Sequence, residues 1–225
     1  MNPIDRVLSL IAPDICINCG AEGSILCQEC QDLMQRIPSI CYACGKASRN
    51  FKPCPKCITK WQPDHVWIYS EYSGLAKDLI KSYKFGSARH AAKIMATMMN
   101  DSLPYFATQP IITYVPTVPA RMRSRGFDHA GILAKEIARQ KNWIYIPLLA
   151  RQMQSRQLGA SREQRRSQLK NALRLNNHDL IKGRHILIVD DVVTTGATIE
   201  ACAKMLKKAG AAQVDAAVFA RTPNK

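Results

Sequence analysis

The cysteines constrain this chain more than any other feature of its sequence. Eight of the nine cysteines fall between residues 16 and 57, and all eight stand in Cys-x-x-Cys pairs. The pairs are Cys16 with Cys19, Cys27 with Cys30, Cys41 with Cys44, and Cys54 with Cys57. A Cys-x-x-Cys turn places two thiolates on one side of a tight loop, so two such turns together supply the four sulfur ligands of a tetrahedral zinc site. The sequence therefore predicts two structural zinc ions in a double zinc-ribbon-like module.

Other uses of paired cysteines fit the sequence less well. A disulfide framework is typical of exported proteins, but the opening "MNPIDRVLSLIAPD" has only a brief apolar segment after two charged residues. A redox motif needs a single Cys-x-x-Cys at a strand–helix junction. No apolar run approaches the ~18 residues that span a bilayer. We therefore expect a cytoplasmic protein without membrane insertion. The four pairs can share two ions sequentially, interleaved or nested, and the short intervals favour the sequential scheme.

The composition of the chain changes near residues 59–65, which predicts two domains, 1–60 and 61–225. The second zone alternates strand-like and helix-like segments, the pattern of an α/β domain with a mostly parallel sheet flanked by helices. Expected strands cover residues 65–72, 110–116, 143–146, 184–191 and 212–220. Expected helices cover residues 73–85, 88–103, 126–140 and 195–210. Residues 150–175 are polar and basic, and we expect a hairpin-like excursion there with a short helix at 161–170.

The chain is strongly basic, with 32 Lys and Arg against 17 Asp and Glu, a formal net charge of +15. Each zinc site would add four thiolate charges and one divalent ion, so two sites would lower this to +11. Such an excess suits a polyanionic partner. Candidate nucleic-acid contacts are Arg123, Arg151, Arg156, Arg162, Arg165 and Arg166. The alternative is a solvated polar face, and the scarcity of aromatic residues in this run argues against a dedicated groove for single strands.

The stretch "VDDVVTTGAT", residues 189–198, places two carboxylates at the end of an apolar run and a Thr-Thr-Gly turn before a helix. Amide groups at a helix start bind anions, and carboxylates accept hydrogen bonds from sugar hydroxyls. The stretch therefore favours a sugar-phosphate site, although a simple helix cap is the plainer alternative. Neither G-x-x-x-x-G-K-[ST] nor G-x-G-x-x-G occurs, so the usual nucleoside triphosphate and dinucleotide motifs are not supported.

The same stretch and two longer segments resemble motifs of known protein families. "VDDVVTTGAT" resembles the 5-phosphoribosyl 1-pyrophosphate (PRPP) signature of type I phosphoribosyltransferases. "YVPTVPARMRSRGFDHAGILA" and "LIKSYKFGSARHAA" resemble elements of the ComF family, bacterial proteins linked to natural competence, meaning DNA uptake and transformation. That family joins an N-terminal cysteine zinc module to a C-terminal phosphoribosyltransferase-like domain, and the resemblance covers nearly the whole chain.

The resemblance implies roles for individual residues. Asp190 and Asp191 would be catalytic residues that meet the ribose hydroxyls. The 5-phosphate would be held by Thr194, Thr195, Gly196, Ala197 and Thr198. The pyrophosphate side, with magnesium bound to PRPP, would draw on Lys84, Arg121, Arg125 and Gly126. Where the family reads RGFNQ, this chain has Asp128 and His129 as the last two residues, so any amide donor there is replaced.

Two functions remain open at this point. The first is a magnesium-dependent phosphoribosyltransferase of unknown acceptor that releases pyrophosphate and acts in DNA uptake. The second is a non-catalytic module that senses PRPP, or binds single-stranded DNA or a partner of the uptake machinery during transformation. The sequence shows no base-recognition pocket that would decide between them.

Overall fold

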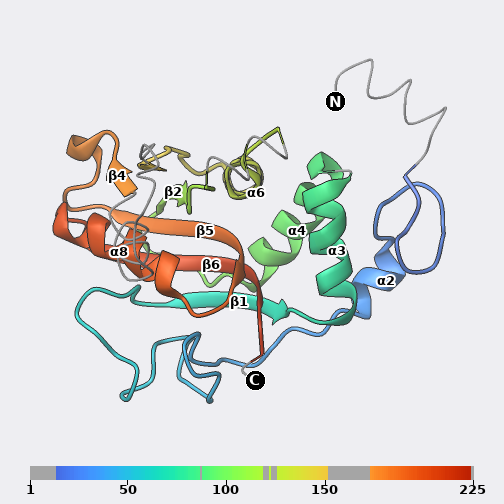
Figure 1. Ribbon diagram of the computed structural model, residues 1–225, viewed down its shortest axis with the longest axis horizontal. Helices are drawn as coiled ribbons and strands as arrows, with labels where there is room; N and C mark the ends of the chain where they lie inside the picture. Colours follow the sequence, from blue (N-terminus) through green and yellow to red (C-terminus); the bar gives the residue numbers. More distant parts are fainter. Residues whose placement is uncertain (1–13, 87, 119–121, 123–125, 152–172, 224–225) are drawn as a thin grey trace, which may run out of the picture.

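Four parallel strands form the central sheet of the protein. The computed structural model describes residues 14–86, 88–118, 122, 126–151 and 173–223 (Figure 1). The strands β1 (Val66–Glu71), β2 (Ile111–Tyr114), β5 (His185–Val193) and β6 (Gln213–Arg221) lie in the order β1-β6-β5-β2. The described helices are α2 (Gln28–Asp32), α3 (Gly74–Phe85), α4 (Ala88–Ser102), α6 (His129–Lys141), α8 (Ala197–Lys208) and the 3-10 helix η1 (His178–Leu180). The predicted mostly parallel sheet is confirmed.

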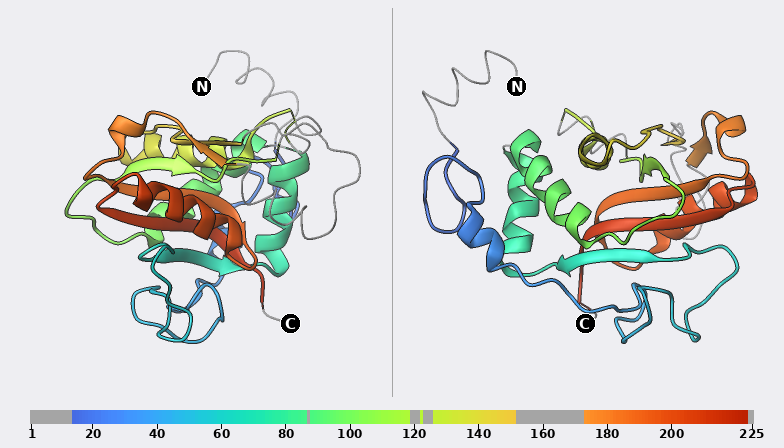
Figure 2. Two further views of the ribbon diagram at one scale, coloured as in Figure 1. Left: turned by 60° about the vertical axis from the view of Figure 1, so that its left-hand side comes forward. Right: turned by 180° about the vertical axis from the view of Figure 1, so that it is seen from behind.

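Helices cover both faces of this sheet (Figure 2). Strand residues alternate between the faces, and in β5 Leu187 and Val189 join one buried cluster while Ile186 and Ile188 join the other. The first cluster contains the apolar faces of α3, α4 and α6, and the second contains that of α8. Burial on both faces explains why β5 and β6 are almost continuously apolar in sequence.

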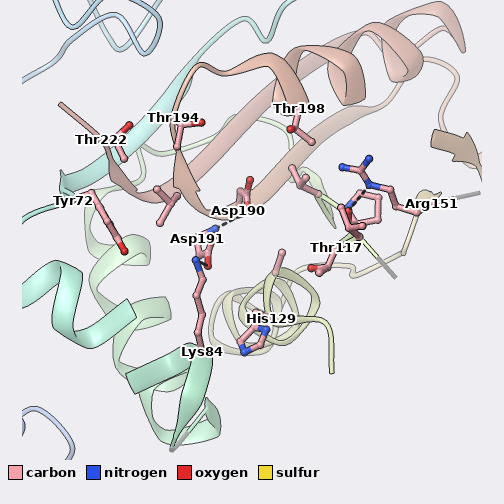
Figure 3. A pocket seen from close by; sticks show the side chains of 15 residues that line it. Tyr72, Lys84, Thr117, His129, Arg151, Asp190, Asp191, Thr194, Thr198 and Thr222 are labelled. Atoms are coloured by element: carbon pink, nitrogen blue, oxygen red, sulfur yellow. Dashed lines mark hydrogen bonds and ion pairs between the residues drawn. The ribbon is translucent and has the colours of Figure 1, made fainter. Parts of the chain in front are cut away.

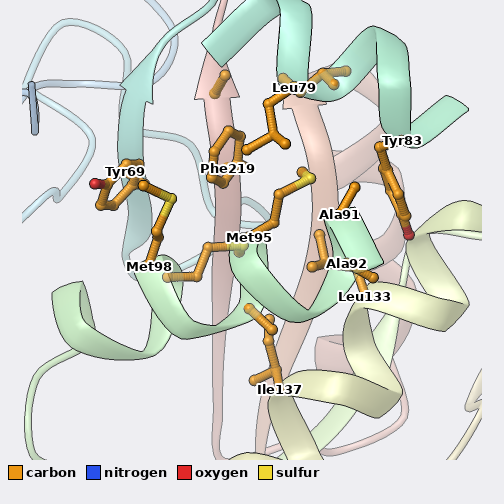
Figure 4. Close-up of a cluster of buried hydrophobic side chains, with 14 of the residues drawn as sticks. Tyr69, Leu79, Tyr83, Ala91, Ala92, Met95, Met98, Leu133, Ile137 and Phe219 are labelled. Carbon is orange, nitrogen blue, oxygen red and sulfur yellow. The ribbon is translucent and has the colours of Figure 1, made fainter. Parts of the chain in front are cut away.

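The first cluster is built around Phe219, which stacks on Tyr69, and the methionines of α4 (Figure 4). Met95 and Met98 are buried there, so the methionines pack the core. In the second cluster Cys202 is fully buried, and desolvation raises the pKa of its thiol to about 12. This ninth cysteine therefore acts as a small apolar side chain.

Two expected strands differ in the structure. Residues 143–146 form no named strand, and within them only Tyr145 bridges to β2, at Ile112. The ladder ends there because the N–H of Leu148 donates to Thr113 Oγ1 and to the carbonyl of Ile146. In the other case β5 extends two residues beyond the expected end at 191, because Val192 and Val193 pair with the last residues of β6. The two aspartates of residues 190 and 191 are thus part of a strand that is still paired.

The expected hairpin-like excursion is confirmed at its base. Strands β3 (Leu149–Arg151) and β4 (Leu173–Leu175) pair antiparallel, while the helix expected at 161–170 lies outside the described residues. The proposed domain boundary near residue 60 stays a prediction. Within the described part of the chain, no helix has the length and apolar character needed to cross a bilayer.

A buried carboxylate lies at the amino ends of the strands, opposite the aspartates of β5. Asp215 has no exposed surface and accepts hydrogen bonds from His65 Nδ1 at 2.9 Å and from His185 Nε2 at 3.0 Å. Gln213 Nε2 donates to the same carboxylate at 2.9 Å. Burial alone would raise the pKa of Asp215, but the hydrogen bonds and charges of His185 and His65 outweigh it and hold the pKa below its ordinary value.

Asp215→Asn is expected to lower the free energy of unfolding by about 1–3 kcal/mol at pH 7, because two histidines lose their charged acceptor. A depressed pKa in the folded state stabilises the protein above the unfolded value of about 3.9 and ceases to do so as the pH falls through the folded value. The difference from wild type should therefore shrink below about pH 4. Urea unfolding at several pH values measures it, with exposed Asp179→Asn as the control. A difference that is absent at pH 7, or constant with pH, would contradict this assignment.

Candidate functional site

A pocket of about 420 Å³ opens at the carboxyl ends of the parallel strands (Figure 3). This is the edge at which open α/β sheets bind their ligands. Its polar lining comes from Asp190 and Asp191 within β5, from residues that follow the four strands, from Arg151 at the end of β3, from the end of α3, and from the starts of α6 and α8. The polar lining residues are Tyr72, Lys84, Thr117, His129, Arg151, Asp190, Asp191, Thr194, Thr198 and Thr222.

The two aspartates of β5 point in different directions because adjacent residues of a strand face opposite sides of the sheet. Asp191 is buried and forms an ion pair with Lys84 at the end of α3, with 2.6 Å between Nζ and Oδ2. Asp190 lies on the other side, nearer Thr198 (Figure 3). Desolvation and the adjacent charge of Asp191 raise the pKa of Asp190 well above its ordinary value. The pocket thus holds one carboxylate that is paired with a lysine and one whose pKa is raised.

The turn after β5 leads directly into α8. Thr194 and Thr198 line the pocket, while Thr195, Gly196 and Ala197 form the turn between them. Gly196 is the N-cap of α8 and has φ +78°, a conformation that suits glycine. Gly196 has no side chain that could cap the helix, and the N–H of Ala197 makes only a long contact of 3.5 Å with Thr195 Oγ1, so the amide groups of the first turn can bind an anion.

The opposite wall of the pocket is held by a helix cap. Asp128, the N-cap of α6, accepts hydrogen bonds from Thr117 Oγ1 at 2.8 Å, from Thr117 N at 3.0 Å and from Gly131 N at 3.4 Å. A carboxylate accepts all three, so Asp128 fixes the loop after β2 to α6. Arg151, at the end of β3, donates from Nε to the carbonyl of Pro116 at 3.1 Å.

The structure brings together part of the predicted set of site residues. Lys84, Asp190, Asp191, Thr194 and Thr198 line one pocket, and Arg151, which the sequence suggested for nucleic acid, lines it too. Gly126 has φ +81° and is not part of this lining. The remaining candidates lie outside the described residues: Arg121, Arg123, Arg125, Arg156, Arg162, Arg165 and Arg166.

Sequence reasoning missed four polar residues of the pocket. Tyr72 and Thr222 directly follow the described bounds of β1 and β6, Thr117 lies in the loop after β2, and His129 begins α6. The available signal was positional: polar residues just after parallel strands meet at the same edge of the sheet.

The eight paired cysteines form two groups that fit metal ions. Within each group of four the sulfur atoms all lie within 4.8 Å of one another, and the groups follow the sequential scheme. Cys19 and Cys27 have their sulfurs 3.6 Å apart, and so do Cys44 and Cys54. Tetrahedral zinc with Zn–S bonds of about 2.3 Å requires sulfurs about 3.8 Å apart. Each group can therefore hold one zinc ion, and four protein ligands leave no open position for catalysis.

The chain is similar in sequence to several known proteins. Residues 122–225 match the phosphoribosyl transferase domain family. The chain is 28% identical to the DNA utilization protein YhgH of Escherichia coli (strain K12), covering 95% of this chain and 99% of that protein. It is also 28% identical to competence protein F of Haemophilus influenzae, covering 92% and 96%. The competence protein ComFC of Streptococcus pneumoniae is 28% identical over 86% of each chain.

These relatives match both the cysteine-rich part and the sheet domain, because the similarity extends over most of the chain. The fold is that of the type I phosphoribosyltransferases, with a parallel sheet flanked by helices and two N-terminal four-cysteine groups.

Proposed function

We propose that this chain, a ComF-type protein with a phosphoribosyl transferase domain, binds the phosphoribosyl group of PRPP in the pocket at the carboxyl edge of its sheet. The observation that carries the proposal is the convergence of two aspartates, two threonines of a helix-start turn and two basic side chains on one cavity. The aspartates, the threonines and the basic side chains each suit a different part of PRPP.

The carboxylates of Asp190 and Asp191 accept hydrogen bonds from the 2- and 3-hydroxyls of ribose. The turn from Thr194 to Thr198 offers backbone amides and hydroxyl groups to the 5-phosphate at the start of α8. The positions of Asp190, Asp191, Thr194 and Thr198 in the pocket lining support these roles. They orient the ribose ring between the two walls of the site.

The basic side chains supply the remaining charge. Lys84 and Arg151 lie in the pocket lining and carry positive charge that suits a pyrophosphate group. Magnesium, when bound together with PRPP, would neutralise further charge on that group, and the carboxylate oxygens in the pocket are ligands of the kind that this ion accepts. In a transferase, stabilising the departing pyrophosphate in this way would lower the barrier to its release.

We propose that this activity takes place in the cytoplasm, where the cell handles the DNA that it has taken up. Relatives are named for DNA utilization and for competence. The charge excess of +15 supports contact with a polyanion such as single-stranded DNA. A PRPP sensor without turnover is the second candidate function. The residues that line the described pocket suit the parts of PRPP, and among them we identify no separate site for a base.

Wild-type protein is expected to bind Mg-PRPP in isothermal titration calorimetry, and Asp190→Ala/Asp191→Ala to bind at least about 100-fold more weakly, because two charged acceptors are lost. The control is Asp101→Ala/Asp179→Ala, which removes two exposed carboxylates and keeps the same net charge as the test variant. Equal binding by all three proteins would contradict the site.

Turnover is decided by release of pyrophosphate from PRPP, measured with free bases and with single-stranded DNA as candidate acceptors. Release above background identifies a transferase, and binding without release identifies a sensor. Retardation of single-stranded DNA at about 50 mM and about 200 mM salt tests the DNA contact, because phosphate contacts weaken steeply over this range. No retardation at low salt would remove DNA from the proposal.

A further inference from the structure

The second four-cysteine group contacts the phosphate turn through one side chain. Tyr42 lies between Cys41 and Cys44 in the sequence and has no exposed surface. Its ring packs so closely on Gly196 that a Cβ added there would lie 2.3 Å from Cε2 of the tyrosine. The ring therefore touches the backbone of the turn at the position where α8 begins.

A polar contact adds to this packing. The hydroxyl of Tyr42 donates to Oε1 of Glu200 at 2.6 Å. Glu200 lies in the first turn of α8, and its own N–H donates to the carbonyl of Gly196 at 2.9 Å. A hydrogen bond to a carboxylate is stronger than one between neutral groups. The tyrosine thus holds both the cap residue and the first turn of the helix.

The backbone of Tyr42 is fixed from a second direction. Its carbonyl accepts from Nε of Arg221 at 2.8 Å, and Arg221 is buried at the end of β6. The next residue, Thr222, lines the pocket and donates from its N–H to the carbonyl of Val193 at 3.0 Å. The loop that carries Tyr42 is therefore bound both to the end of β6 and to the start of α8, the two chain segments that border the pocket here.

The first four-cysteine group has different neighbours. Cys16 and Cys30 belong to the buried cluster that also contains Leu79 of α3, on the other face of the sheet from α8. Tyr42 belongs with Ile199 of α8 in the second cluster. The two groups of cysteines therefore support different parts of the domain.

We infer that Tyr42 is a positioning residue through which metal held by Cys41, Cys44, Cys54 and Cys57 sets the conformation of the phosphate turn. The metal fixes the loop, the loop fixes the tyrosine, and the tyrosine holds Gly196 and Glu200 in the arrangement that receives an anion. Loss of metal from this group releases the turn and weakens binding of a sugar phosphate. The part of the inference that concerns affinity rests on the proposed function.

Tyr42→Phe keeps the ring and removes the hydrogen bond to Glu200, so it should fold and show a roughly 3- to 10-fold loss of Mg-PRPP affinity, which corresponds to about 0.7–1.4 kcal/mol. Amide hydrogen exchange in residues 194–200 should become faster in the same variant. Tyr69→Phe is the matched control, because Tyr69 is also buried but lies in the other cluster. It should leave both measurements as in wild type.

The metal is tested by a matched pair of ligand variants. Cys54→Ser and Cys27→Ser each remove one partly buried ligand, from the second and the first group respectively. Exchange in residues 194–200 should rise more in Cys54→Ser. Equal exchange in these two variants, or no change in Tyr42→Phe, would overturn the inference. If wild type fails to bind Mg-PRPP, the proposed function fails, whereas the exchange measurements still decide the coupling.

Discussion

Gly196→Ala is expected to weaken binding of Mg-PRPP by more than about tenfold and to lower the free energy of unfolding by about 2–4 kcal/mol. Two effects combine. At φ +78° an L side chain is strained, and the new Cβ would lie 2.3 Å from Cε2 and 2.8 Å from Cδ2 of Tyr42. The ring is fully buried and hydrogen bonded to Glu200, so the turn has to move instead. Calorimetry and urea unfolding measure the two quantities.

The matched control for this prediction is Gly183→Ala. Gly183 also has a positive φ, +71°, but a Cβ there would meet nothing within 4 Å. It should therefore lose only the backbone contribution of about 1–2 kcal/mol and leave binding unchanged. Combining Gly196→Ala with Tyr42→Leu should recover part of the lost stability. If the two glycine variants behave alike, the contact between the turn and Tyr42 has no energetic importance.

Removal of zinc is expected to destabilise the protein by at least about 5 kcal/mol, which for a chain of this length lowers the melting temperature by about 10–20 °C. The metal-binding free energy of a site with four cysteine ligands contributes to folding, because the unfolded chain has no preformed site. The buried Cys16, Cys30 and Cys41 would lose the metal as their partner inside the protein. Elemental analysis should give about two zinc ions per chain before chelation, and thermal melts followed by circular dichroism should show recovery when zinc is restored.

Cys202→Ala provides the control for the metal measurement. This cysteine belongs to neither group, so the variant should keep both ions and lose only a little packing energy. A zinc content near one would eliminate one of the two sites. An unchanged melting temperature after complete chelation would show that the sulfur clusters do not stabilise the fold.

Local sequence patterns predicted most of the sheet domain. The apolar runs of β1, β5 and β6 and the periodic faces of α3, α4 and α8 are properties of short segments, and these elements appear within a few residues of their expected bounds. The end of β5 was misplaced because Val192 and Val193 continue the strand only through pairing with β6, a partner distant in the sequence. Residues 143–146 failed as a strand because the N–H of Leu148 donates to the side chain of Thr113, so the ladder with β2 ends.

The residues of the candidate site also fall into two sets, those that a local sequence pattern predicts and those that only long-range packing brings together. Asp190, Asp191 and the threonines of the turn are nearly contiguous, so one short motif revealed them. Tyr72, Thr117 and Thr222 come from separate segments and meet only when parallel strands align their carboxyl ends. The contact of Tyr42 with Gly196 joins residues far apart in the chain and leaves no local trace in the sequence. Long-range packing of this kind is what sequence patterns cannot supply.

The ion pair between Lys84 and Asp191 makes the pocket partly self-neutralised. A ligand that offers only an anion competes with Asp191 for the lysine, and a ligand that offers only hydroxyl groups competes with Lys84 for the carboxylate. In either case the ligand leaves one buried charge poorly satisfied. A molecule that carries both a diol and a pyrophosphate can satisfy the two partners together. Under the proposed function, the ion pair disfavours free ribose and free pyrophosphate, because each of them can satisfy only one of the two partners.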